Sequence, residues 1–162
     1  MDENAGREIA EALGVLLKRG TRIELHRTLT ADMGEAVDEL TYPILSGLER
    51  TGPRSAADLA PDVGLDRSGV TRRASRLEAA GLVRREPDPA DRRATLLALT
   101  DEGERAVETL RGRLSGHISA SLASWAPGEA AAFAGYLQRF VAAGPFGQGE
   151  PQGPVRARTS DR

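Results

Sequence analysis

The chain of 162 residues contains no cysteine, which excludes disulfide bonds, thiolate metal sites and thiol-based redox sensing. Aromatic residues make up only 4% of the sequence, so a hydrophobic core must be built mainly from Leu, Val, Ile and Ala. No apolar run approaches the length of about 20 residues that a membrane-spanning helix requires. The acidic N-terminus lacks the basic and apolar regions of a secretory signal peptide. These absences predict a globular protein of the cytoplasm.

The sequence also lacks the common patterns of catalytic and metal sites. Its two histidines, His26 and His117, are far apart and neither belongs to an HExxH motif. There is no Gly-x-Ser-x-Gly motif, no P-loop and no dinucleotide-binding fingerprint. A metal site made from the two histidines and nearby acids would have to be assembled by the fold. We therefore predict no enzyme activity, no cofactor and no metal.

Lysine is almost absent, because 21 of the 22 basic residues are arginine. Residues 67–93 carry eight arginines against four acidic residues, although the whole chain has a net charge of −2. A basic stripe on an acidic body is typical of one-sided contact with a polyanion. An arginine-rich surface that is simply solvated is the alternative.

Residues 41–100 show the element order of a helix-turn-helix followed by a β-hairpin. A helix is predicted from Thr41, as its N-cap, to about Arg50. Ser55 resembles the start of a capping box and begins a short helix, which Pro61 is expected to tighten or end.

The next predicted helix has clear start and stop signals. Gly64 supplies the preceding turn, and Asp66 caps a helix over residues 67–80. Gly81 ends this helix, and Leu82 folds back on it in a Schellman motif.

The polar residues near the start of this helix are placed for base readout. Arg67, Ser68, Thr71 and Arg72 lie opposite its apolar positions. Arginine can donate two hydrogen bonds to guanine, and the threonine methyl group can touch thymine. Two further arginines are better placed for phosphates: Arg73 and Arg76. The alternative is that this polar face is simply exposed to solvent and contacts no DNA.

The β-hairpin is predicted from strands over residues 82–86 and 94–99, joined by the turn PDPADRR. Its tip, Asp91-Arg92-Arg93, can place an arginine in the narrow minor groove, where the potential is most negative. Asp91 is spaced to hold Arg93 by a charge-assisted hydrogen bond.

Helices are predicted on both sides of this module. Residues 6–30 have apolar side chains at mostly helical spacing, and Thr100 caps a long helix. Pro127 opens a last helix, and residues 144–162 are predicted to be a disordered tail. The apolar repeat of the long helix comprises Val107, Leu110, Leu114, Ile118, Leu122 and Trp125.

The apolar stripes at both ends of the chain are wider than one small domain can cover, which predicts a homodimer. The expected fold is mainly α with a small β-hairpin wing: a winged helix-turn-helix flanked by dimerisation helices. Its predicted parts are an N-terminal dimerisation helix and connector (1–40), the winged helix-turn-helix (41–100), C-terminal dimerisation helices (101–143) and the tail (144–162).

Over residues 41–104, and most specifically in GLDRSGVTRRASRLEAAGLV and DPADRRATLLALTDEG, the sequence resembles the MarR family of bacterial transcription regulators. The flanking helices agree in number and order, which extends the resemblance to about residues 6–143. The resemblance implies a homodimer that binds a palindromic operator near its own or a neighbouring gene. The predicted DNA contacts are Ser55, Arg67, Ser68, Thr71, Arg72, Arg73, Arg76, Asp91, Arg92 and Arg93.

Members of this family often respond to small phenolic or other lipophilic acids, bound between the dimerisation helices and the winged helix. In this chain the candidate ligand residues are Arg22, His26, Tyr42 and Trp125. Arg22 and His26 are one helical turn apart and could together bind a carboxylate. Helix-packing or surface residues are the alternative for all four.

The function predicted is a sequence-specific transcriptional regulator, acting as a repressor that a small acid releases. A winged helix that binds another protein, without a DNA target, is the second hypothesis. That module would not need arginines at the wing tip or along the recognition helix.

Overall fold

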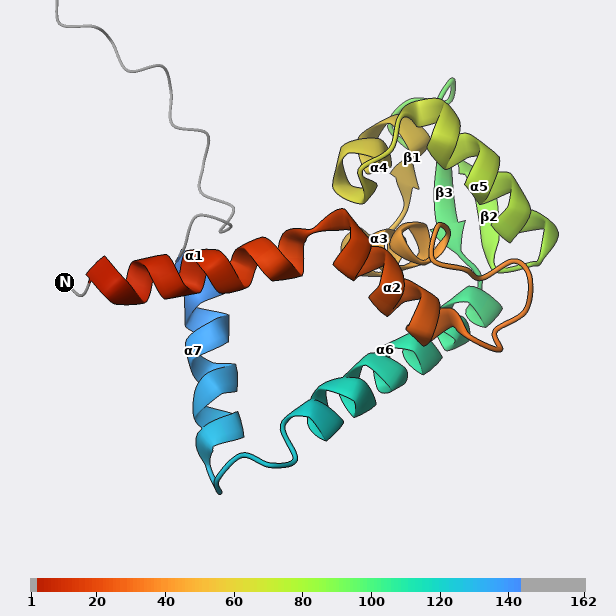
Figure 1. Cartoon of the computed structure of the whole chain (residues 1–162). Helices are drawn as coiled ribbons and strands as arrows, with labels where there is room; N and C mark the ends of the chain where they lie inside the picture. The colour runs from red at the N-terminus through yellow and green to blue at the C-terminus, as the bar shows by residue number, and fades with distance from the viewer. Residues whose placement is uncertain (1–2, 144–162) are drawn as a thin grey trace, which may run out of the picture. The chain divides into compact units, whose positions relative to one another are not determined.

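The computed structural model describes residues 3–143, which are mainly helical with one small sheet (Figure 1). The chain divides into two compact units between His117 and Ile118. In chain order the elements are α1 (Glu3–Leu17), α2 (Arg19–Thr30), α3 (Tyr42–Thr51), β1 (Arg54–Ser55), α4 (Ala56–Val63), α5 (Arg67–Ala79), β2 (Val83–Pro87), β3 (Thr95–Leu99), α6 (Asp101–Ser121) and α7 (Glu129–Ala143).

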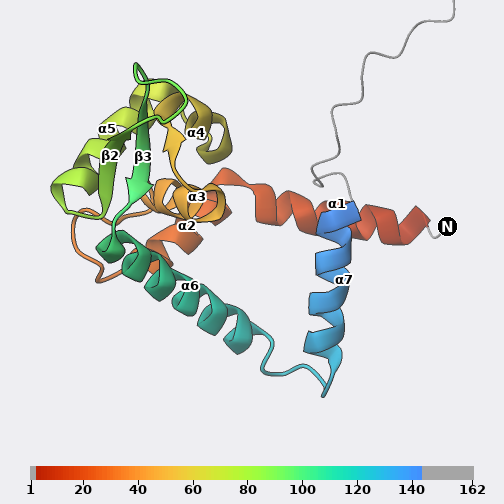
Figure 2. The ribbon, with the colours of Figure 1, turned by 180° about the vertical axis from the view of Figure 1, so that it is seen from behind.

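The sheet is antiparallel, with β3 between β1 and β2 (Figure 2). The hairpin register pairs Val83 with Leu99 and Pro87 with Thr95. On the other edge of β3, Arg54 pairs with Leu97. The predicted fold class is confirmed, and the two-residue strand β1 is an addition that the sequence pattern did not indicate.

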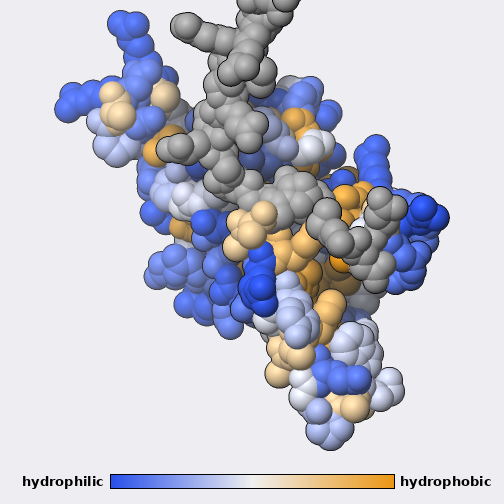
Figure 3. Space-filling view, turned by 90° about the vertical axis from the view of Figure 1, so that its left-hand side faces the viewer, coloured by the Kyte–Doolittle hydropathy of each residue, from blue (hydrophilic) through white to orange (hydrophobic). Residues whose placement is uncertain are grey.

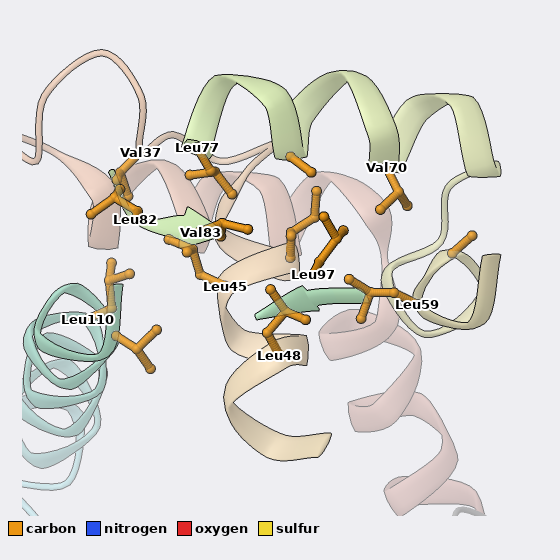
Figure 4. Packing of buried hydrophobic residues seen from close by; sticks show 14 of the residues in the cluster. Val37, Leu45, Leu48, Leu59, Val70, Leu77, Leu82, Val83, Leu97 and Leu110 are labelled. Carbon is orange, nitrogen blue, oxygen red and sulfur yellow. The ribbon is translucent and has the colours of Figure 1, made fainter. Parts of the chain in front are cut away.

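The core of the first unit joins α3, α5, the sheet and the start of α6. Leu45, Leu77 and Leu97 are each at most 1% exposed and pack together with Leu110 (Figure 4). Burial of one such leucine contributes roughly 1.5–3 kcal/mol. The core therefore holds α5 against the sheet, with its opposite face turned to solvent.

Three predicted local signals are present. Asp66 accepts a hydrogen bond from the Gly69 N–H (2.7 Å), so it caps α5. Gly81, at φ +74°, ends this helix, and the Leu82 N–H donates to the Leu77 carbonyl (2.9 Å), as a Schellman motif requires. Thr100 Oγ1 accepts from the Gly103 N–H (3.0 Å) and caps α6.

Two expectations about the first helices were wrong. The helical pattern over residues 6–30 is split at Lys18, whose extended backbone (ψ 132°) separates α1 from α2. Gly14 and Gly20 flank this break, and each lowers helix propensity by about 1 kcal/mol relative to Ala. Thr41 does not cap α3 with its side chain, because its Oγ1 accepts from the Asp38 N–H (2.9 Å) and its hydroxyl donates to the Ala36 carbonyl (2.9 Å).

Two helix ends also differ from the prediction. The helix α4 continues through Pro61 to Val63 and ends at Gly64, whose φ of +68° is left-handed. Pro61 removes one backbone donor, but the rest of this short helix is held by its cap and by packing of its apolar face. The helix α6 ends at Ser121, so Leu122 and Trp125 lie beyond it. The predicted tail over residues 144–162 lies outside the described residues.

Candidate nucleic-acid interface

The helix α5 has one buried and one exposed face, as predicted. Val70 and Leu77 are completely buried, together with Ala74, on the side that packs against the core. The exposed side chains near the N-terminus of α5 are Arg67, Ser68, Thr71 and Arg72. The helix-turn-helix formed by α4 and α5 therefore exposes the polar N-terminal residues of α5 to solvent.

Hydrogen bonds order the first turn of α5. The Ser68 hydroxyl donates to Asp66 Oδ2 (2.9 Å), and the Thr71 hydroxyl donates to the Arg67 carbonyl (2.9 Å). Hydrogen bonds from the Gly69 N–H and the Ser68 hydroxyl lower the pKa of Asp66, so this cap stays ionised at neutral pH. The methyl group of Thr71 remains the part of that side chain available to a base.

The arginines of the basic stripe fall into two groups. Three of them are ion-paired within the protein: Arg76 with Asp38, Arg84 with Glu86, and Arg85 with Glu78. In the described part of the chain, the other five have no carboxylate oxygen within 4.0 Å: Arg67, Arg72, Arg73, Arg92 and Arg93. These five lie on α5 and at the wing tip, the two places where the sequence predicts DNA contacts.

The wing tip is a hydrogen-bonded turn with exposed arginines. The Ala94 N–H donates to the Asp91 carbonyl (2.8 Å), and the Arg93 N–H donates to Asp91 Oδ1 (3.0 Å). The expected contact between the Asp91 carboxylate and the Arg93 guanidinium is therefore wrong, because the carboxylate binds the backbone of the same residue. Asp91 shapes the turn, and the guanidinium groups of Arg92 and Arg93 extend into solvent.

Three other predicted contacts already bind the protein. Ser55 caps α4: its Oγ accepts from the Asp58 N–H (3.1 Å) and donates to Asp58 Oδ2 (2.6 Å). Arg73 donates from Nη1 to the Gly69 carbonyl (3.2 Å), one turn back on α5. Arg76 binds Asp38 and the carbonyl of Glu35 (3.1 Å).

Three of the four candidate ligand residues belong to the first unit. The rings of His26 and Tyr42 lie 4.5 Å apart between centroids, at an interplanar angle of 53°. Burial lowers the pKa of His26, and the positive charge of Arg22 also lowers it. A hydrogen bond with the Glu39 backbone raises this pKa, but the net shift is downward. His26 is consequently neutral at pH 7, and Arg22 supplies the positive charge of this group.

Tyr42 also lines a shallow hollow of about 170 Å³ between α3 and α6. Its lining includes the cations Arg50 and Arg111 and the apolar side chains of Leu110 and Leu114. Trp125 belongs to the second unit, where its ring lies 5.3 Å from that of Phe133. No group of three or more potential metal ligands is assembled among residues 3–143.

The sequence patterns did not indicate the polar contacts between distant parts of the chain, among them those of Asp38 and Arg113. Asp38, in the connector between α2 and α3, binds Arg76 on α5. Arg113 on α6 donates to the carbonyls of Leu29 (2.8 Å) and Ala31 at the end of α2. An arginine facing a helix C-terminus satisfies carbonyls that lack partners, but no local sequence signal shows which helix it meets.

A short helix, a left-handed glycine turn, an exposed polar helix and an arginine-tipped hairpin define a winged-helix DNA-binding protein. A model of the MarR family matches residues 39–95. The HTH-type transcriptional regulator YcgE of Bacillus subtilis is 32% identical over 105 residues, which cover 64% of this chain and 67% of that protein. YxaD, of the same organism and class, is 26% identical over 85% of this chain and 94% of its own length.

Solved structures of transcriptional regulators are also similar to this chain. The transcriptional regulator Tm0710 of Thermotoga maritima has a TM-score of 0.64 at 26% identity, over 85% of this chain and 92% of that one. PcaV of Streptomyces coelicolor, solved with its natural ligand, has a TM-score of 0.51 at 29% identity, over 88% and 92%. The chain belongs to the MarR family and is a DNA-binding transcriptional regulator, not an enzyme. Within residues 3–143, no helix has the length and apolarity needed to cross a membrane.

Proposed function

We propose that this regulator acts as a homodimer that binds a palindromic operator at its own or a neighbouring promoter and represses transcription there. One observation carries the proposal. Within the basic stripe, the five arginines on α5 and at the wing tip that have no carboxylate oxygen within 4.0 Å in the described part of the chain stand beside three that carboxylates neutralise. Cations that the protein leaves unpaired at these two places are available for bases and phosphates.

Exposed apolar side chains support the homodimer. On α1, Ile9 is 47% and Leu16 is 61% exposed; on α7, Tyr136 is 66% and Leu137 is 45% exposed. Figure 3 shows apolar surface open to solvent beside hydrophilic surface. A second copy would bury such surface. Because one winged helix specifies few base pairs, two copies on successive half-sites would also raise specificity.

Repression is supported by a relative. The HTH-type transcriptional repressor NicR of Pseudomonas putida is 25% identical over 108 residues, which cover 67% of this chain and 68% of that protein. The physical mechanism is competition, because a dimer that covers promoter DNA excludes other proteins from it.

Fluorescence anisotropy tests operator binding. We expect the wild-type protein to bind its promoter duplex more tightly than a scrambled duplex, with two chains per operator. Arg93→Ala should weaken this binding by roughly 1–3 kcal/mol, because a wing-tip cation leaves the minor groove. Arg27→Ala removes the same charge from α2 and should have little effect, since Arg27 pairs with Glu24. Equal, salt-sensitive binding to both duplexes would show phosphate attraction alone and contradict the proposal.

We further propose that a small lipophilic acid releases the repressor from DNA by binding beside Arg22, His26 and Tyr42. The structure of the relative PcaV with its natural ligand supports an effector in this family. In this chain a cationic side chain and two adjacent rings lie together at α2 and α3. A carboxylate would pair with Arg22 while an aromatic body packs against the rings.

Calorimetric titration with salicylate tests the effector site. We expect binding at about millimolar ligand or below, and a loss of about tenfold in affinity for Arg22→Met, since hydrogen bonds to charged groups contribute roughly 1.5–3 kcal/mol. The anion favours protonated His26, whose pKa is lowered in the free protein, so affinity should rise as pH falls from about 7.5 to about 6. His26→Gln should remove this pH dependence. Absence of heat for the wild type would count against salicylate-like effectors.

A further inference from the structure

The connector between α2 and α3 forms a compact hydrogen-bonded turn at residues 35–41. Asp38 Oδ1 accepts from the backbone N–H groups of Leu40 and Thr41, both at 2.9 Å. The Thr41 hydroxyl accepts from the Asp38 N–H (2.9 Å) and donates to the Ala36 carbonyl. Val37 is 4% exposed and Thr41 is completely buried, so the turn is anchored in the core.

Arg76 joins this turn to the recognition helix α5. Its Nη2 donates to Asp38 Oδ2 and to the carbonyls of Glu35 (3.1 Å) and Ala36 (3.4 Å). Partial burial alone would raise the pKa of Asp38, but hydrogen bonds from Arg76, Thr41 and Leu40 together hold that pKa below its usual value. Asp38 is therefore ionised at neutral pH, and its two oxygens have separate roles: one closes the turn and the other binds the helix.

The connector begins where α2 ends, at Thr30. Arg113 on α6 holds that end by donating to the carbonyls of Leu29 and Ala31. The connector is thus attached at its start to α6 and, through Asp38 and Arg76, to α5. No other ion pair joins α5 to the α2–α3 connector among the residues that the structure describes.

We propose that Asp38 and Arg76 form a clamp that positions the recognition helix for operator DNA, and that Arg76 is a positioning residue and not a phosphate contact. The proposal rests on the proposed operator binding and adds a role to a residue of the basic stripe. Base readout requires side chains of α5 to meet base edges at hydrogen-bond distance, so a small rotation of α5 would spoil specific contacts. Phosphate attraction, which tolerates such rotation, would be preserved.

The variant Asp38→Asn separates the two roles of Arg76. Asparagine keeps an Oδ1 acceptor for the turn but presents an amide where the carboxylate met the guanidinium. The clamp predicts a loss of about tenfold in affinity for a duplex that the wild-type protein has selected from a random library. Affinity for a scrambled duplex should stay equal or rise slightly, because one negative charge is lost. A phosphate role for Arg76 predicts the opposite for the selected duplex, namely equal or tighter binding.

Arg76→Lys and a stability measurement complete the test. Lysine keeps the charge but cannot reproduce the guanidinium's planar set of donors, so the clamp predicts a similar loss of specific affinity. The double variant should bind the selected duplex no more weakly than either single variant, since both remove one interaction. The melting temperature of Asp38→Asn should fall by less than about 4 °C, because the paired side chains are 43% and 30% exposed.

The outcomes are distinct. If the wild-type protein selects no duplex, operator binding fails and the clamp fails with it. If the wild type selects a duplex that Asp38→Asn binds equally or more tightly, the clamp alone is wrong. Parallel loss of selected and scrambled binding with a large drop in melting temperature would indicate a general structural role and would also overturn the positioning role.

Discussion

Replacing Arg72 by alanine is expected to weaken operator binding by roughly 1–3 kcal/mol and to relax specificity at one base pair in each half-site. Arg72 is exposed on α5, close after the capped first turn, and has no carboxylate within 4.0 Å in the described part of the chain. Two parallel hydrogen bonds from its guanidinium to guanine would both be lost. The measurement is competition between the selected operator and a series of duplexes that differ from it at single base pairs.

Arg72→Lys provides the matched control, because lysine keeps the charge and loses the planar pair of donors. If Arg72 reads a guanine, the lysine variant should lose most of the discrimination at that base pair while keeping nonspecific affinity. A uniform loss across all duplexes, with a salt slope smaller by about 0.9, would instead identify Arg72 as a phosphate contact. That result would leave Arg67 and Thr71 as the candidates for base readout.

The helix ends of the winged helix were predictable from sequence because capping depends on residues within three or four positions of each other. Asp66, Gly81 and Thr100 each carry such a local signal, and each has the predicted role in the structure. Thr41 has the same residue type as a common cap, but the Asp38 N–H and the Ala36 carbonyl compete for its hydroxyl. The turn before a helix can therefore override a cap that is favoured by residue type alone.

Contacts between distant residues were not predictable. The strand β1 forms because β3 offers a free edge to Arg54, and nothing in the two-residue sequence of β1 indicates a strand. Lys18 interrupts a pattern that was helical by spacing, since apolar periodicity does not report one extended residue. Likewise, the contact of Arg113 with the Leu29 carbonyl joins residues far apart in the chain.

The same limit applies to the candidate DNA surface. The sequence located the basic stripe but could not show which arginines the fold neutralises. Arg85 is paired because the hairpin folds back on α5 and brings Glu78 within 2.8 Å. Arg76 is paired because the α2–α3 connector crosses the end of the same helix. The unpaired arginines could therefore be identified only after the tertiary structure had shown which arginines lie beside carboxylates.

Gly103→Ala is expected to lower the free energy of unfolding by about 3 kcal/mol, because the added methyl group has no space. A Cβ at Gly103 would lie 2.0 Å from the carbonyl oxygen of Leu82 and 3.0 Å from its carbonyl carbon. Both are backbone atoms, which cannot move aside as a flexible side chain can. The melting temperature should fall by about 6–12 °C in thermal denaturation followed by circular dichroism.

Gly112→Ala is the matched control on the same helix. Its Cβ would meet no atom within 4 Å, so alanine should raise stability by about 0.5–1 kcal/mol through helix propensity alone. Opposite signs for the same substitution at two positions of α6 would show that the close approach at Gly103, and not glycine itself, determines the result. Equal behaviour of the two variants would contradict the packing described at Leu82.

The close approach at Gly103 also connects stability to DNA binding. The Leu82 carbonyl accepts the Thr100 N–H (3.1 Å), and the Thr100 hydroxyl donates to the Gly81 carbonyl (2.6 Å). The end of α5, the start of the wing strand β2 and the first turn of α6 therefore meet within these few residues. A methyl group at Gly103 would push them apart, so Gly103→Ala should reduce operator affinity even below its melting temperature. Unchanged affinity in the folded variant would show that the wing is positioned by the sheet alone.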